Sequence, residues 1–176
     1  KTPLELIATY SGRNFGANGF YASPSAVDQY EETQASLISL SQRRTKNAWI
    51  FKPKVYWRRG QDMYEYIRDK PEIYRNLHVT NKLGAAFDAS AASPWGLTGM
   101  GVDISSVSIR SNNLGQRSRT MMNFFLEHRF YLLEKKVDIT PGIAANYFSD
   151  FGTHSFPGID LGCQISTKLR LYANTG

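Results

Sequence analysis

The sequence predicts an all-β fold, arranged as an antiparallel up-and-down meander of about nine strands. Three observations lead to this prediction. Apolar and polar side chains alternate with a period of two along most of the chain. Helical periodicity is confined to residues 62–76, where Pro71 interrupts it. Long and short connections alternate, which places every long connection at the same end of the sheet.

The predicted strands begin near the start of the chain, where Leu4, Leu6, Ala8 and Tyr10 share one face. Segments with a clear apolar face and a polar face are residues 4–10, 48–58, 82–90, 99–105, 137–147, 158–166 and 168–173. Two more strands fit the alternation less well, because residues 31–42 are mostly polar and residues 121–133 are apolar on both faces. The strands measure roughly 8 to 13 residues, whereas an average strand has about five or six.

Composition excludes several classes of protein. Apolar residues make up 41% of the chain and the net charge is +6 over 176 residues, so disorder is not expected. No apolar stretch approaches the ~20 residues of a transmembrane helix. The single cysteine, Cys163, excludes an internal disulfide and a thiolate metal cluster, and its strand position suits a small apolar residue. Basic residues form only short clusters at 43–46 and 58–59, so we expect no nucleic-acid partner.

The connections favour a transmembrane β-barrel. The long ones are residues 11–29, 59–78 and 106–118, the short ones are 43–47, 92–96, 134–136 and 166–167, and residues 149–156 are intermediate. Outer-membrane barrels have short periplasmic turns and long extracellular loops. Trp49 and Trp57 share a face about 26 Å apart at ~3.3 Å per residue, which suits an apolar band of ~25 Å. Pro53, in the middle of this strand, predicts a β-bulge.

Motifs for catalysis, metal binding and cofactor binding are absent from the sequence. The three histidines belong to no metal-binding pattern, and there is no G-x-S-x-G, G-x-G-x-x-G or Walker A motif. We therefore expect neither an enzyme nor a cofactor. Asp62, Glu65, Asp69 and Glu72 could supply oxygen ligands to calcium, but their spacing fits no calcium loop, and ion pairs with neighbouring basic residues are favoured.

Aromatic and hydrogen-bonding side chains in the long connections suit the recognition of a ligand. Ordinary packing of the loops is the alternative for each of them. The candidates for ligand binding are Phe15, Asn18, Tyr21, Tyr64, Tyr66, Tyr74, Arg75, Asn112 and Asn113.

Four segments, in their order and spacing, carry a resemblance to a known family. The first reads GRNFGANGFYASPSAVDQYEETQ, and the others are residues 56–81, 106–130 and 138–162. Together they resemble TonB-dependent outer-membrane transporters of Bacteroidetes-type bacteria, in the branch of cobalamin and siderophore receptors. The resemblance implies a barrel of about 22 strands with a plug in its lumen. Residues 1–176 would then be one segment of that barrel, without the plug domain or the remaining strands.

The resemblance also implies a function in the bacterial outer membrane. A scarce nutrient, such as cobalamin or an iron chelate, would bind the extracellular loops, and TonB with ExbB and ExbD would supply the energy for import. Inward side chains would line the lumen or touch the plug; these are Lys52, Lys54, Tyr56, Arg58, Lys82 and Asp88. Outer-membrane lipid would cover the apolar face, and the open sheet edges would allow self-association.

Two other functions remain open at this point. A soluble or surface β-sheet module that binds a glycan or another ligand through Trp57, Tyr64 and Tyr66 would bury Trp49 and Phe51 in a sandwich core. A barrel enzyme would need a catalytic group at the rim of the loops, where His78 and Asp62 are the only close candidates.

Overall fold

The computed structural model describes residues 3–20 and 24–176, and these form one ten-stranded antiparallel sheet. The strands are β1 (Leu4–Gly16), β2 (Tyr30–Gln42), β3 (Arg44–Lys46), β4 (Trp49–Glu65), β5 (Arg75–Ser93), β6 (Gly96–Ser111), β7 (Gly115–Leu132), β8 (Val137–Phe148), β9 (Gly152–Ser166) and β10 (Leu169–Thr175). They pair in chain order from β1 to β10, with β3 beside β4 as a continuation of β2. The predicted meander is confirmed, with ten strands in place of nine.

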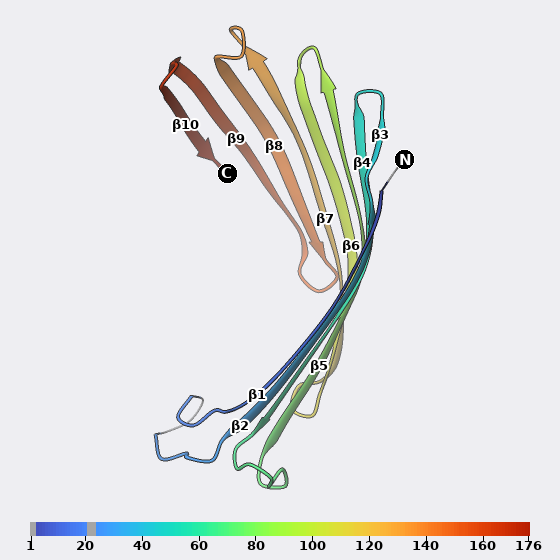
Figure 1. The fold of residues 1–176 in the computed structure, drawn as a ribbon, viewed down its shortest axis with the longest axis vertical. Coiled ribbons are helices and arrows are strands. Elements are labelled where there is room, and N and C mark those ends of the chain that lie inside the picture. Colours follow the sequence, from blue (N-terminus) through green and yellow to red (C-terminus); the bar gives the residue numbers. More distant parts are fainter. Residues whose placement is uncertain (1–2, 21–23) are drawn as a thin grey trace.

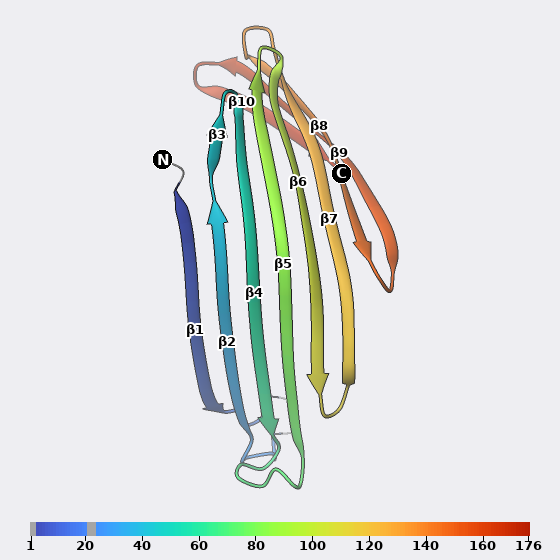
Figure 2. The same ribbon diagram turned by 90° about the vertical axis from the view of Figure 1, so that its right-hand side faces the viewer.

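The sheet is tall and curved, and it does not close within the described residues. Figure 1 shows the short turns at one end of the sheet and the connections β1–β2 and β4–β5 at the other end. Figure 2 shows the strands side by side, with β8, β9 and β10 curling away from the plane of β1 to β7. We call the end with the short turns the short-turn end, and the end with the connections β1–β2 and β4–β5 the loop end. The turn between β8 and β9 lies well short of the loop end (Figure 1).

Strand register divides the side chains cleanly between two faces. Residues directly opposite one another in the ladders point to the same side of a sheet. One row across the sheet is Phe51, Ala89, Met100, Leu126 and Ile143, and another parallel row on that side is Val55, Ala85, Ile104, Met122 and Tyr147. The opposite side carries the row Lys54, Ala86, Asp103, Asn123 and Asn146. We call these sides the apolar face and the polar face.

The sheet has almost no core of its own. The buried apolar residues of the described chain are Ala17, Ala26 and Ala89, all of them small. Large apolar side chains are exposed instead, and Trp49 is 38% exposed on the apolar face. The buried Trp49 that a sandwich requires is therefore not found in this single layer, which counts against the soluble-module alternative.

The strands extend further at the loop end than the sequence predicts. β1 continues to Gly16 and β4 continues to Glu65, which leaves loops at 17–29 and 66–74. The third predicted loop, 106–118, is wrong: it is strand except for the turn at 112–114. Polar and aromatic side chains beyond the apolar band do not alternate clearly, yet their backbones stay paired, so the sequence pattern ends before the strand does.

The weak helical pattern at residues 62–76 forms no helix. Asp62 to Glu65 pair with β5 on one side and with β2 on the other, and these two ladders override the weak helical pattern. No helix of the described residues is long and apolar enough to cross a membrane.

Pro53 does not produce the predicted bulge. Its strand, β4, pairs with β5 without a change of register. On the other side, two residues on each strand separate the pair Ser41–Lys54 from the pair Arg44–Phe51, so neither strand has an extra residue. The ladder is simply interrupted there, because proline has no N–H group to donate. Pro141 coincides with a similar interruption between β7 and β8, where the pairs Glu127–Gly142 and Phe130–Ile139 also enclose equal lengths.

Candidate functional site

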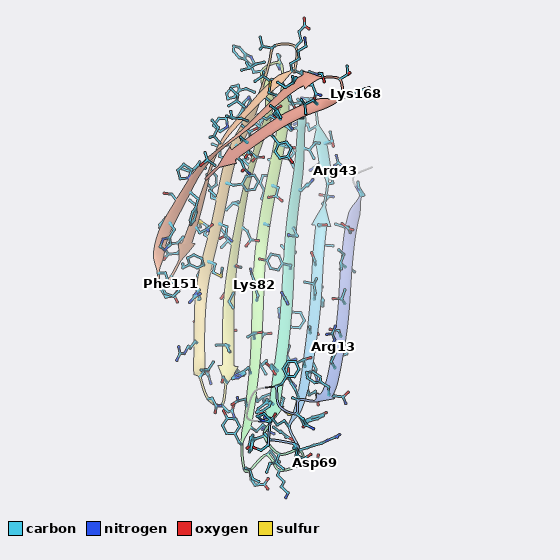
Figure 3. The ribbon with its side chains drawn as sticks, turned by 90° about the vertical axis from the view of Figure 1, so that its left-hand side faces the viewer. Arg13, Arg43, Asp69, Lys82, Phe151 and Lys168 are labelled. Carbon is cyan, nitrogen blue, oxygen red and sulfur yellow. The ribbon has the colours of Figure 1, made fainter. Side chains whose placement is uncertain are left out.

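The loop end of the polar face holds a hollow of about 380 Å³. Its lining residues are Glu31, Asp62, Tyr64, Tyr66, Tyr74, Asn76 and His78. Side chains crowd around this end of the sheet, near the labelled Asp69 (Figure 3). Three of the predicted tyrosines, Tyr64, Tyr66 and Tyr74, therefore meet in one place. We call this hollow the loop pocket.

Strand register brings the lining of the loop pocket together. Phe15, Glu31, Tyr64 and Asn76 form one row across β1, β2, β4 and β5. In a parallel row on the same face Asp62 stands opposite His78. The rings of Tyr64 and Tyr74 meet edge to face, with centroids 6.4 Å apart, so the wall of the pocket combines aromatic edges with hydroxyl groups.

Gln29 fixes the β1–β2 loop against this wall. Its side chain is 2% exposed, its Oε1 accepts a hydrogen bond from the Gly19 amide at 3.0 Å, and its Nε2 donates to the Tyr64 hydroxyl. The Gln29 amide in turn donates to Asn18 Oδ1 at 2.9 Å. These bonds place Asn18 in the support of the loop and hold the Tyr64 ring in position.

The turn between β6 and β7 closes another side of the loop end. Asn112 Oδ1 accepts from the Leu77 amide at 2.8 Å, and Asn112 Nδ2 donates to the Arg75 carbonyl. Asn113 Nδ2 donates to Asn76 Oδ1 and, at 3.4 Å, to the Tyr74 hydroxyl. Asn112 therefore supports the turn, whereas Asn113 lies beside the pocket wall.

The remaining predicted ligand residues lie outside the pocket lining. Phe15 shares the row of Tyr64 and is 39% exposed on the edge strand β1. Arg75 begins β5 and is exposed. Tyr21 lies outside the described residues. A direct ligand contact stays a prediction for every one of these residues.

Glu31, Asp62 and His78 belong to the pocket but were not among the predicted ligand residues. Glu31 begins the mostly polar segment 31–42, yet it is only 6% exposed, and its Oε2 has no hydrogen-bond partner within the described chain. The cause is the β2–β4 register, which sets Glu31 opposite Tyr64. That register follows from the two-residue turn at 47–48, whereas the sequence predicts the connection at 43–47.

Burial raises the pKa of Tyr64 above its usual value of 10.0. The hydrogen bond from Gln29 opposes this rise, and the neighbouring Tyr66, Tyr74 and Glu31 add to it. Tyr64 therefore stays protonated at neutral pH, with a hydroxyl that can both donate and accept.

The sheet centre carries a second polar group of side chains, which we call the Tyr56 cluster: Lys54, Tyr56, Arg58, Lys82 and Asp103. The Tyr56 hydroxyl donates to the Asp103 carboxylate, with oxygen separations of 3.0 and 3.1 Å. The Lys54 and Lys82 ammonium groups lie 5.4 and 5.6 Å from the ring centroid. Figure 3 labels Lys82 near the middle of the sheet. Lys52 and Asp88 lie on the same face and are exposed.

A third group lies nearer the short turns, and we call it the Asp138 cluster: Arg129, Asp138, Gly162 and Arg170. Asp138 is 7% exposed and pairs with Arg129 at 2.8 Å and with Arg170. Gly162 leaves space for this arrangement, because a Cβ atom there would lie 2.5 Å from Arg170 Nη2.

The two candidate catalytic residues at the loop end, His78 and Asp62, do not form a catalytic arrangement with one another. His78 Nδ1 lies 2.8 Å from Ser111 Oγ, but that oxygen also accepts from the amides of Asn113 and Leu114, as in a turn cap. Asp62 makes no hydrogen bond to His78 within the described residues. Residues 3–20 and 24–176 contain no group of three His, Cys, Asp or Glu side chains that could hold a metal ion. The ion pairs predicted for Asp62, Glu65, Asp69 and Glu72 are not found among the described residues. The neighbouring Arg68 instead makes a cation–π contact with Tyr30 at 4.8 Å.

Comparison with known proteins gives matches in structure but not in sequence. No family model and no curated protein matches the sequence. The siderophore receptor PirA from Pseudomonas aeruginosa is similar over 98% of this chain, with a TM-score of 0.79 and 9% identity. The FrpB iron transporter from Neisseria meningitidis is similar over 98%, with a TM-score of 0.76 and 12% identity. A mutant of the ferric enterobactin receptor PfeA from Pseudomonas aeruginosa is similar over 82%, with a TM-score of 0.71 and 12% identity.

The chain spans only part of each of these solved structures: 29% of PirA, 33% of FrpB and 25% of PfeA. At such low identities the likeness concerns the fold. The ten-stranded open meander has the fold of a segment of these receptor and transporter chains.

Proposed function

We propose that the chain is a barrel segment of an outer-membrane active transporter, which binds a scarce nutrient at its extracellular loops and imports it with TonB-coupled energy. The observation that carries this proposal is the single-layer sheet with one apolar face and one charged face. Lipid on the apolar face and a polar lumen, water-filled or plugged, on the charged face are the two surroundings that suit such a sheet. The fold shared with segments of PirA, PfeA and FrpB supports the same function.

An iron chelate is the nutrient we propose, ahead of cobalamin. The similar structures are described as a siderophore receptor, a ferric enterobactin receptor and an iron transporter. The loop pocket combines three tyrosines with Asn76, His78 and the carboxylates of Glu31 and Asp62. Its aromatic rings and hydrogen-bonding groups suit a chelate that presents aromatic rings and oxygen atoms. Bound nutrient would pass inward through the lumen, with the plug of the parent chain and TonB–ExbB–ExbD as partners.

The proposal is tested with the full-length protein produced in a Gram-negative host that lacks its own iron-chelate receptors. Outer membranes are isolated, and binding of a radiolabelled catecholate iron chelate is measured. We expect Tyr74→Ala to weaken binding about tenfold, as loss of an aromatic anchor does, and Tyr74→Phe to weaken it less. Tyr131→Ala, at the short-turn end of the polar face, is the matched control.

Two results would contradict the proposal. One is recovery of the protein in a soluble fraction. The other is chelate binding that Tyr74→Ala leaves at the level of the unchanged protein, while the barrel still assembles.

A further inference from the structure

The Tyr56 cluster carries an excess of positive charge that the sheet itself does not neutralise. Lys54, Arg58 and Lys82 face a single carboxylate, Asp103, and none of the three forms an ion pair with any described residue. Across the sheet, the row that holds Arg58 and Lys82 continues to Thr9 and Leu37 without any acid.

Three acids lie nearest to these cations on the polar face. Asp88 stands directly opposite Lys52, and these two opposite charges balance one another. Asp103 accepts both contacts of the Tyr56 hydroxyl, at 3.0 and 3.1 Å. Glu5, at the far end of the Lys54 row, accepts from Ser41 Oγ at 3.3 Å. The cations are therefore left facing the space above the sheet.

The Tyr56 ring holds two of these cations, Lys54 and Lys82. The ring lies over Gly84, where a Cβ atom would approach the Tyr56 hydroxyl oxygen to 2.5 Å. Lys54 and Lys82 lie against this ring from two different strands. Fixed cations lose less side-chain entropy when they bind an anion than free surface lysines do.

Space for an occupant is present beside the cations. A hollow of about 660 Å³ is lined by Lys54, Tyr56, Arg58 and Lys82 on one side. Residues of β1 and β2, among them Ile7, Thr9, Leu37 and Ser39, line the other side, and Asp103 also lines the hollow. The four steps along the strand from Lys54 to Arg58 span about 13 Å at ~3.3 Å per residue, which is wider than one carboxylate. A peptide with two acidic side chains fits this spacing better than a small anion does.

We propose that the Tyr56 cluster is the docking site for an acidic segment of the parent chain that occupies the lumen. This inference rests on the proposed function, because that function places the polar face around a plug. It adds the sign of the charge on the plug surface and the position on the barrel wall where that surface docks. Charge complementarity selects the occupant, since carboxylates would pair with Lys54, Arg58 and Lys82.

The test uses a zero-length carbodiimide on the full-length protein in isolated outer membranes. This reagent joins lysine amines only to carboxylates in direct contact, and mass spectrometry identifies the joined peptides. We expect Lys54 and Lys82 to be joined to Asp or Glu outside residues 1–176. Lys46 and Lys168, which are exposed at the short-turn end, are the internal controls and should give no such products.

A charge-reversal pair provides a second measurement. Lys54→Glu with Lys82→Glu should loosen the occupant and raise the entry of a large hydrophilic antibiotic at least tenfold. Lys46→Glu with Lys168→Glu, which changes the charge equally, should leave entry unchanged. A heat-modifiable band on gels shows in every variant that the barrel has assembled.

The outcomes separate the two proposals. Two results overturn the docking site alone, provided that the barrel assembles in the outer membrane. In one, carbodiimide joins Lys54 and Lys82 only to carboxylates of residues 1–176. In the other, added citrate binds these lysines and protects them from the carbodiimide reaction. A protein absent from the outer-membrane fraction overturns the proposed function, and the docking site with it.

Discussion

The Tyr56 cluster and the Asp138 cluster occupy the same face of one sheet, yet they treat their charges in opposite ways. Asp138 is buried between two arginines from β7 and β10, so the cluster joins strands that are not neighbours. Around Tyr56 the only carboxylate binds a hydroxyl, and three cations remain without an ion pair in the described chain. The first arrangement stabilises the sheet itself, and the second leaves positive charge for a partner.

This difference separates two uses of a polar side chain that look alike in the sequence. Lys82 and Arg129 are both basic residues on the polar face. Only the partner across the strands tells a structural arginine from a docking lysine. The predictions below test that distinction, in order of decreasing effect.

Replacing Asp138 with Asn should give the largest loss of stability. The change leaves Arg129 and Arg170 without their carboxylate, and we expect the free energy of unfolding of the full-length protein in lipid to fall by about 2–3 kcal/mol. Asp150→Asn is the control. Asp150 pairs with Arg119, and the Arg119 and Asp150 side chains are 38% and 45% exposed, so this ion pair should contribute no more than about 1 kcal/mol. Equal losses from the two changes would remove the distinction between the clusters.

Gly162→Ala should break the same cluster by crowding. The added Cβ would lie 2.5 Å from Arg170 Nη2 and 2.6 Å from Asp138 Oδ2, so the ion pair must shift, with an expected loss of about 1–2 kcal/mol. Gly142→Ala is the matched change, since its Cβ meets nothing closer than 3.4 Å. Urea unfolding in lipid measures both variants, and an unchanged Gly162→Ala protein would contradict the predicted crowding.

Tyr56→Phe should have a smaller effect on stability, about 1 kcal/mol, because it removes one hydroxyl from Asp103. The freed carboxylate can then pair with Lys54, so joining of Lys54 to acids outside the chain should fall. Tyr147→Phe, on the apolar face, is the control for both readings. A carbodiimide product pattern identical to that of the unchanged protein would show that Asp103 does not compete.

Titration of the Tyr64 hydroxyl should have the smallest effect on the stability of the protein. Its pKa is raised in the folded protein, so its contribution to stability is complete below pH 10.0 and is lost as the pH rises towards the folded pKa. In a pH titration, the ultraviolet absorbance of tyrosinate should therefore appear at a higher pH for the unchanged protein than for Tyr64→Phe supplemented with free tyrosine. The appearance of the Tyr64 signal below pH 10 would contradict the sign of the shift.

Periodicity in the sequence predicted the two faces well and the ends of the strands poorly. Phe51, Ala89 and Met100 alternate with polar neighbours because the apolar face must be continuous, and the structure places them in one row. Tyr64 and Ser111 lie beyond that band, where only backbone pairing maintains the strand, and they were therefore predicted to lie in loops.

The candidate site was only partly predictable for a related reason. Tyrosines in long connections pointed to Tyr64, Tyr66 and Tyr74, and the loop pocket contains all three. Glu31 and His78 enter the pocket from other strands through register, and no local pattern marks them. The charge balance of the Tyr56 cluster likewise depends on Asp103, which stands 47 residues from Tyr56 in the sequence.

The near absence of a core also bears on how freely such a sequence can diverge. In a layered protein each large side chain interlocks with others, so a change in volume at one site constrains its neighbours. Here the apolar side chains point away from the rest of the chain, and under the proposed function they meet fluid lipid, which adapts to any shape. Exchange among Leu, Val, Ile and Phe should then be close to neutral. The fold itself is found at identities of only 9% to 12%, with TM-scores of 0.71 to 0.79.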